Sequence, residues 1–330
     1  MRRRELLGGG LSLAAASTAR AQSGGKQRRL AIFSPSESTG LMREDGPNAY
    51  YRVLFEELRR LGFVEGQNLT VERYGKEQTA AGLEAMAAEI VRSAPDVIYA
   101  IGALTYFRGL TTIPVVAISS DPVALGVAQS LARPGGNFTG VSVDTGPSIY
   151  GKRIELLREV VPKLSKLAYL GMRIAWQMVQ GAGVQAAART AEIALTPVLL
   201  EQPTTEGAYR AAIAGAARDG AQAMMVGDSA DTMANETTIL SALAALRLPA
   251  MHTFPEAVQA GGLMAYSFDL AELNRQAAAD IAAILRGAKP GEIPFYQATT
   301  FLLSVNLKTA KRLGLTFPPS ILGRADRIVE

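Results

Sequence analysis

Apolar and polar positions change along the chain in short blocks that predict strands and helices in turn. The run 113–118 is apolar and largely β-branched with no polar alternation, which is typical of a strand buried on both faces of a parallel sheet. Polar residues then interrupt the run, where Asp121 can cap a following helix and Pro122 fits its first position. We therefore expect a helix over 123–132, ended by the Arg-Pro-Gly-Gly segment at 133–136.

The same alternation extends over the whole first half of the chain and restarts after residue 143. In the first half the pattern predicts strands at 30–33, 69–74, 96–101, 113–118 and 137–143, and further helices at 50–61 and 83–91. After residue 143 it predicts strands at 167–172, 195–200, 223–226, 248–252, 263–266 and 301–305, and helices at 149–161, 179–191, 206–218, 235–246, 271–286 and 306–313. Strand–helix alternation predicts parallel α/β layers, and its restart predicts two doubly wound α/β lobes.

Length and composition agree with a folded chain of two domains. The 330 residues are many for one core, and a composition of 48% apolar with 19% charged residues favours a folded chain over a disordered one. The absence of Cys excludes disulfides, thiolate metal sites, cysteine nucleophiles and a lipid-modified N-terminal cysteine.

The first 21 residues have the pattern of a secretory signal. Three arginines precede a short apolar run at 6–16, and Ala19-Arg20-Ala21 supplies a small-x-small cleavage site. The arginines also match part of a twin-arginine signal, so both the general and the twin-arginine export route are open. Removal of 1–21, with its four Arg and one Glu, lowers the formal net charge from +4 to +1. A near-neutral mature chain gives no electrostatic reason to expect binding to nucleic acid or an anionic membrane.

Candidate ligand contacts lie where polar residues follow predicted strands, because open α/β sheets bind ligands at the carboxyl ends of their strands. Asp121 can cap a helix with one oxygen and accept from a ligand with the other, and Asp228 has the analogous place in the second half. Arg173 is either a surface charge or a bidentate partner for a ligand carboxylate. Phe254 and Tyr266 are either core or hinge packing or a stacking platform for an apolar ligand. The predicted ligand-binding residues are Ser34, Ser36, Thr39, Gly102, Ala103, Asp121, Arg173, Asp228, Phe254 and Tyr266.

Several catalytic and cofactor sites are rejected on the sequence. Residues 146–152 match most of a phosphate-binding loop, but Arg153 stands where Ser or Thr would hold Mg²⁺. His252 is the only histidine, which excludes His-rich metal sites and any relay of two imidazoles, and we expect it to be structural or at a pocket edge. No G-x-S-x-G elbow is present. We therefore expect no metal, no cofactor and no catalytic residues.

Long blocks of the sequence resemble one family. They are GFVEGQNLTVE (62–72), IPVVAISSDPVALG (113–126), LARPGGNFTGVS (131–142), GKRIELLREVVP (151–162), the segment 248–294 beginning LPAMHTFPEAVQAGG, and LLSVNLKTAKRLGLTFPPSIL (302–322). The chain resembles the ABC-transporter substrate-binding proteins of the tryptophan/tyrosine-type periplasmic binding group. The resemblance implies a type I periplasmic binding fold, with lobe 1 at 28–143 plus about 267–296, lobe 2 at 144–266 plus about 297–330, and a three-strand hinge. The segments 171–176 and 103–110 depart from the family pattern, and both lie at expected lips of the pocket.

The resemblance also implies the function. We expect a periplasmic, monomeric protein that captures an amino acid-like or aromatic or carboxylate solute and delivers it to an ABC permease in the inner membrane. A periplasmic sensor that presents the bound ligand to a membrane receptor is one alternative, and an exported enzyme on the same scaffold is another. Neighbouring permease and ATPase genes would separate transport from sensing.

Overall fold

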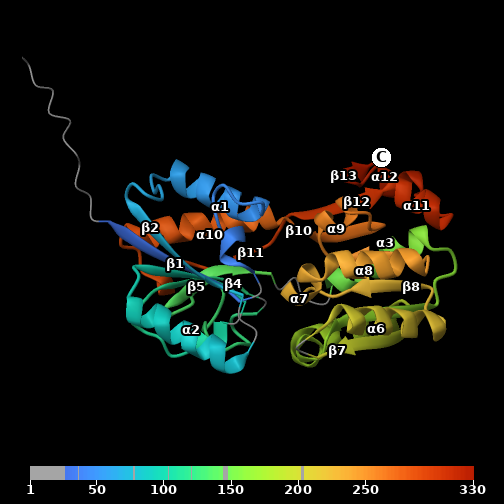
Figure 1. Cartoon of the computed structure of the whole chain (residues 1–330), viewed down its shortest axis with the longest axis horizontal. Helices are drawn as coiled ribbons and strands as arrows, with labels where there is room; N and C mark the ends of the chain where they lie inside the picture. The colour runs from blue at the N-terminus through green and yellow to red at the C-terminus, as the bar shows by residue number, and fades with distance from the viewer. Residues whose placement is uncertain are drawn as a thin grey trace, which may run out of the picture.

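Two α/β bodies lie side by side along the long axis of the molecule (Figure 1). The computed structural model describes residues 27–35, 37–76, 79–102, 104–119, 121–143, 148–201 and 204–330. We call the body with the six-stranded sheet the first lobe and the body with the seven-stranded sheet the second lobe. The predicted fold class, α/β with two parallel-stranded lobes, is confirmed.

The sheet of the first lobe is parallel throughout its described strands. In spatial order these are β11 (Tyr296–Gln297), β5 (Phe138–Ser142), β4 (Val115–Ser119), β3 (Val97–Ile101), β1 (Arg28–Ser34) and β2 (Leu69–Gly75). The strand predicted over 113–118 is β4, and each of its residues is buried. Burial on both faces therefore explains why its apolar run has no polar alternation.

Helices cover both faces of this sheet. α1 (Ala49–Arg60) and α10 (Leu270–Leu285) pack on one face, and α2 (Ala80–Ser93) packs on the other. Along β1, Leu30 and Ile32 belong to the apolar cluster under α1 and α10, whereas the intervening Ala31 and Phe33 belong to the cluster under α2. This is the period of two that a strand imposes on its side chains. The short helical turns of this lobe are η1 (Thr39–Leu41), η2 (Leu104–Phe107) and η4 (Pro290–Glu292).

The second lobe repeats the architecture. Its strands lie in the order β13 (Arg327–Val329), β12 (Phe301–Asn306), β10 (Met264–Phe268), β9 (Ala250–His252), β8 (Ala223–Val226), β6 (Lys166–Met172) and β7 (Ala194–Leu200). The pairs are parallel except for the antiparallel pair of β10 with β12. α3 (Ser148–Val160) and α5 (Gly181–Thr190) pack with one apolar cluster, and α6 (Glu206–Arg218) and α8 (Glu236–Ala245) pack with the other. The shorter helices are α4 (Arg173–Ala175), the π-helical η3 (Trp176–Gln180), α7 (Ala230–Ala234), α9 (Pro255–Gln259), α11 (Leu307–Leu313) and α12 (Pro319–Leu322).

The chain passes between the two sheets three times: after β5, after β10 and after β11. The first passage runs through residues 144–147, which lie outside the described residues. In the other two passages the segments contact each other. The ring of Tyr266 stacks on Phe301 with centroids 5.7 Å apart, and the Asp269 amide donates to the Thr300 carbonyl at 3.1 Å. These two passages therefore run as a paired ribbon between the lobes.

The helix predicted over 123–132 is wrong. Asp121 caps a turn as expected, because its Oδ1 accepts from the amides of Val123 and Ala124 at 2.9 and 3.0 Å. The turn then ends at Gly126, whose φ of +69° lies in the left-handed region that a helix cannot use. The amide of Val127 bonds back to the Pro122 carbonyl at 3.0 Å, so the chain reverses after one turn.

Candidate ligand-binding site

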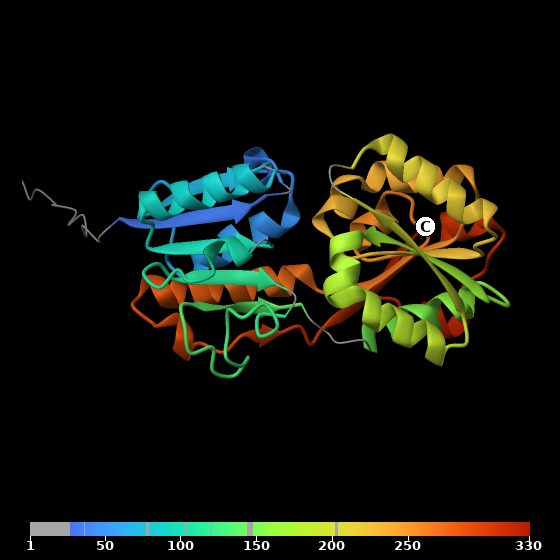
Figure 2. The same ribbon diagram turned by 90° about the horizontal axis from the view of Figure 1, so that it is seen from below.

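The candidate site consists of the loops that follow the strands at the facing ends of the two lobes. In Figure 2 the blue arrow of β1 points from the first lobe towards the second. In Figure 1, α7, which follows β8, lies on the side of the second lobe nearest the first. Parallel strands end at one edge of their sheet, so the loops after β1, β3 and β4 share an edge, and so do those after β6, β8 and β9.

In the first lobe, Glu37 organises the loop after β1. Its Oε2 accepts hydrogen bonds from Ser34 Oγ at 2.9 Å and from the Tyr51 hydroxyl at 2.6 Å, and its Oε1 accepts from Asn48 Nδ2 at 2.8 Å. Burial, and then the charge of Glu37, raise the pKa of Tyr51 well above its usual range, so the phenol stays a donor. The predicted contact Ser34 is fully buried and is engaged with this carboxylate. Sequence reasoning missed Glu37, although its place in a polar loop after a buried strand was a usable signal.

Of four other predicted residues in the first lobe, the structure describes Thr39 and Gly102. Thr39 begins η1 and is exposed. Gly102 directly follows β3 and has a φ of +70°, and its amide donates to the Ile118 carbonyl at 3.3 Å. Ser36 and Ala103 lie outside the described residues.

Asp121 and Ser119 lie at the end of the central strand β4. Oδ1 of Asp121 caps the turn, and Oδ2 accepts no hydrogen bond from the described residues. Ser119, which sequence reasoning missed, is 6% exposed, and its hydroxyl has no partner among the residues that the structure describes. A buried hydroxyl without a partner is costly, so it is a candidate ligand contact.

In the second lobe, Asp228 is fixed by a buried arginine. Arg153 is 0% exposed; its Nη1 donates to Asp228 Oδ1 at 2.8 Å and its Nε to the Tyr266 carbonyl at 2.8 Å. The Thr253 hydroxyl donates to the same Oδ1 at 2.5 Å. Oδ2 of Asp228 accepts no hydrogen bond within the described part of the chain, and there Arg153 Nη2 is also unpartnered. Asp228 therefore has one oxygen locked and one available.

A second set of bonds holds the Asp228 backbone. Gln180 Nε2 donates to the Asp228 carbonyl at 2.7 Å, and the Tyr169 hydroxyl donates to Gln180 Oε1 at 2.6 Å. Burial, and then the charge of Asp228, raise the pKa of Tyr169 well above its usual range. The loop after β8 is thus held from β6 and from the π-helical turn η3.

Sequence reasoning missed Arg153 as the partner of Asp228. The residue lies on the inward face of α3 together with Tyr150, Ile154 and Leu157, at helical spacing. An arginine on the apolar face of a helix was the available signal, because a buried guanidinium needs a partner.

Arg173 follows β6, and its Nε donates to Glu201 Oε1 at 2.7 Å. Both side chains are largely exposed, 47% and 71% respectively, so this surface pair contributes little stability. Of the two alternatives for Arg173, the structure thus describes a surface ion pair and leaves the ligand contact a prediction.

The two predicted aromatic contacts lie at the passages between the lobes. Phe254, just before α9, meets Phe268 edge-on with ring centroids 5.9 Å apart, and it packs against the apolar cluster of the first lobe. Tyr266 takes part in the stacked pair with Phe301 described above. Both rings therefore contribute to hinge packing, and stacking on a ligand stays a prediction.

One side-chain hydrogen bond joins the lobes directly. The hydroxyl of Tyr50, in the first turn of α1, donates to Oε1 of Glu256 in α9 at 2.5 Å. Burial, and then the charge of Glu256, raise the pKa of Tyr50 far above its usual range, so the phenol remains protonated.

Within the described residues, no three His, Cys, Asp or Glu side chains gather in a way that could hold a metal ion. No helix among those residues is both long and apolar enough to cross a membrane.

Comparison with known proteins identifies the family. The sequence model described as "ABC transporter substrate binding protein" matches residues 40–329. The chain belongs to this family. Among curated relatives of this substrate-binding protein is a "Tyrosine-binding protein" of Clostridioides difficile (strain R20291), 25% identical over 153 residues. That match spans 44% of this chain and only 41% of the relative's length.

Solved structures share the fold of this substrate-binding protein. A conserved domain protein from Vibrio cholerae O1 biovar eltor has a TM-score of 0.80 at 22% identity. An ABC domain from Streptococcus pneumonia in complex with L-Trp has a TM-score of 0.79 at 20% identity. Each alignment covers 92% of this chain and 100% of the other.

Proposed function

We propose that this chain is a solute-binding protein that holds a small molecule between its two lobes and delivers it to an ABC-type permease. Membership of the substrate-binding family supports the general role. The observation that carries the proposal is Asp228, whose Oδ1 is locked by Arg153 and Thr253 while Oδ2 accepts nothing from the described residues. A carboxylate fixed before the ligand arrives loses little conformational entropy on binding.

The proposed ligand is an amino acid-like or aromatic or carboxylate solute. Asp228 from the second lobe and Asp121 from the first each offer an oxygen that can accept from an ammonium or hydroxyl group. The unpartnered Ser119 hydroxyl adds a group next to Asp121. The names of two similar proteins, a tyrosine-binding protein and a complex with L-Trp, support the same class.

We propose lobe 1 at 28–143 plus about 267–296 and lobe 2 at 144–266 plus about 297–330, with a hinge formed where the chain changes lobes; the three passages between the sheets, after β5, β10 and β11, support this division. A ligand that touches both lobes stabilises the closed arrangement by the contacts it makes only there. A preference of about 5.5 kcal/mol is enough to move a two-state hinge from mostly open to mostly closed. No bond is broken, so the proposed function requires no catalytic group.

We further propose that the protein is exported to the periplasm as a monomer. The pattern of residues 1–21 and the family's role in import systems support export.

A thermal-shift screen against amino acids, aromatic acids and sugars tests the function, together with mass spectrometry of any ligand retained on purification. A ligand at 100 times its Kd adds about 2.7 kcal/mol, which raises the Tm by several degrees. We expect Asp228→Asn to weaken binding of the identified ligand at least tenfold. Asp219→Asn, at the exposed end of α6, is the matched control and should bind as the wild type does. Unchanged affinity in both Asp228→Asn and Asp121→Asn would show that the site lies elsewhere.

A further inference from the structure

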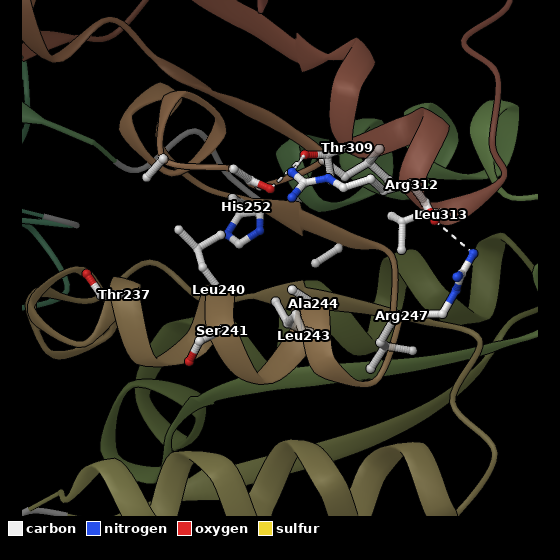
Figure 3. A pocket seen from close by; sticks show the side chains of 16 residues that line it. Thr237, Leu240, Ser241, Leu243, Ala244, Arg247, His252, Thr309, Arg312 and Leu313 are labelled. Carbon is white, nitrogen blue, oxygen red and sulfur yellow. Dashed lines mark hydrogen bonds between the residues drawn. The ribbon is translucent and has the colours of Figure 1, made fainter.

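The second lobe carries a groove whose walls come from that lobe alone. It has a volume of about 580 Å³ and lies between α8 and α11, over β9 and the turn that leads into β10 (Figure 3). A cavity of this size is within the range of small-molecule sites. It contains none of the residues predicted to bind the solute between the lobes.

The turn at Gly261 and Gly262 creates one end of the groove. Gly261 has a φ of +117°, which few residues other than glycine adopt. A Cβ atom on Gly262 would lie 2.8 and 2.9 Å from Cδ2 and Nε2 of His252, and 2.9 Å from the Ala257 carbonyl oxygen. The missing side chain therefore makes the space that the imidazole occupies.

His252 is buried there as the only imidazole of the chain. It is 1% exposed and lines the groove, which agrees with the predicted structural or pocket-edge role. Its Nδ1 lies 3.0 Å from Glu236 Oε1, yet neither atom has an aligned hydrogen-bond partner among the described residues. His252 lines the groove, whereas Glu236 does not.

A guanidinium lies at the same end. Arg312 Nη2 donates to Thr309 Oγ1 at 2.8 Å and would lie 3.9 Å from a Cβ on Gly261. At the other end, Arg247 Nη2 donates to the Arg312 carbonyl at 2.8 Å, as Figure 3 shows. Neither guanidinium has a carboxylate within 4 Å in the part of the chain that the structure describes. Two exposed guanidinium groups thus line the groove without a counter-charge from the described residues.

Most of the remaining wall is apolar, although Thr237 and Ser241 of α8 also line it. α8 contributes Leu240, Leu243 and Ala244, and α11 contributes Leu313. The groove therefore combines a leucine-lined body with cationic N–H donors beside Gly261.

We propose that this groove is a second small-molecule site, which takes an amphipathic monocarboxylate. Its carboxylate would pair with Arg312 beside His252, and its apolar part would lie along the leucines of α8 and α11. Arginine presents parallel N–H donors that match a carboxylate, and a leucine-lined body favours an aliphatic or aromatic chain over a sugar.

Octanoate is the probe, and its uncharged analogue octanamide is the ligand control. The full-length mature protein is labelled with ¹³C at the leucine methyl groups, and its spectra are followed during titration. We expect octanoate to shift saturably the methyl signals of Leu240, Leu243 and Leu313. Octanamide should bind at least tenfold more weakly, because it cannot form a charge-assisted pair.

Three variants locate the site. Arg312→Gln should weaken octanoate binding about tenfold, whereas Lys311→Gln removes the same charge from an exposed neighbour on α11 and should change it less than twofold. Ala244→Leu fills the groove with a good helix former and should abolish binding. Equal affinity for octanoate and octanamide, wild-type affinity in Arg312→Gln, or shifts confined to other leucines would each overturn the proposal. If Arg312→Gln does not fold, Ala244→Leu and the octanamide comparison still decide it. The solute-binding role survives any of these failures, because Asp228→Asn tests it separately.

Discussion

Replacing Tyr50 by Phe removes one hydroxyl and with it the hydrogen bond that joins α1 of the first lobe to α9 of the second. The hydroxyl donates to Glu256 Oε1 at 2.5 Å, and it stays protonated because burial and the glutamate charge both raise the pKa of Tyr50. The phenyl ring of the variant keeps the packing of the tyrosine ring. The substitution therefore acts on this one contact between the lobes.

The size of the effect follows from the kind of bond. A hydrogen bond to a charged group contributes about 1.5–3 kcal/mol, but Glu256 is exposed and solvent screening lowers that figure to about 1 kcal/mol. A free energy of about 1 kcal/mol is about a fivefold change in an equilibrium constant. We expect Tyr50→Phe to shift the ligand-free protein about fivefold towards arrangements in which the lobes are apart.

Single-molecule energy transfer measures this shift directly. The natural sequence has no Cys, so a dye pair can be placed on cysteines introduced at Glu84 in α2 and Arg210 in α6, both exposed. Tyr106→Phe is the matched control, because it removes a tyrosine hydroxyl of the first lobe that makes no hydrogen bond to a described residue of the second lobe. Glu256→Gln should act in the same direction but less, since an amide oxygen still accepts.

If, in Tyr50→Phe, the ratio of molecules with the lobes apart to molecules with the lobes in contact stayed within twofold of the wild-type ratio, that result would refute this reasoning. So would an equal change in Tyr106→Phe, because the effect would then not come from the contact between the lobes.

Three further predictions concern stability, each measured by chemical denaturation. Arg153→Met should lower the free energy of unfolding by about 3 kcal/mol, because it leaves Asp228 without its buried partner. The control Lys152→Met breaks an exposed pair with Glu155 and should lower the free energy of unfolding by less than 1 kcal/mol. Equal losses in the two variants would contradict the argument. Gly140→Ala should prevent folding or lower the free energy of unfolding by several kcal/mol, because φ is +131° and a Cβ would lie 2.2 Å from the Ala117 carbonyl oxygen. The control Gly151→Ala places its methyl group in open space beside α3 and should leave the stability unchanged or raise it. Burial raises the pKa of Asp280 from 3.8 to about 7, so the folded state holds this proton longer than the unfolded state, and stability falls as the pH rises from about 4 to 7. Asp280→Asn should remove this loss of stability with rising pH, and at pH 8 it should be more stable than the wild type by at most about 4 kcal/mol. The same pH dependence in both proteins would show that Asp280 is not its source.

Elements with a strong local pattern were predictable from the sequence. The apolar, β-branched run at 113–118 indicated the buried strand that the structure has as β4, and the helix expected over 206–218 is α6 within the same bounds. The false helix over 123–132 shows the limit of local signals: an Asp cap followed by Pro begins a single turn as well as a helix, and Gly126 decides between them.

The candidate site was less accessible to sequence reasoning, because its geometry depends on distant pairs. Asp228 was expected from its place after β8, but its partner Arg153 is 75 residues away in α3. Glu37 accepts from the end of β1 and from the start of α1, and Tyr50 donates to a residue 206 positions further along. These groups meet only in the folded chain, and no fixed spacing in the sequence predicts that they pair.

The first lobe is completed by two segments from late in the sequence, α10 and β11, and this affects how the chain folds during synthesis. α10 buries Leu273, Ala277 and Ile281 against the first lobe, and β11 adds the strand beside β5 at residues 296–297. Until a ribosome has made nearly nine-tenths of the polypeptide, the N-terminal sheet lacks part of the helical layer on one face and its edge strand. A nascent chain of this design stays incomplete and open to chaperones or a translocase until late, so cutting the gene at a lobe boundary should yield two insoluble halves.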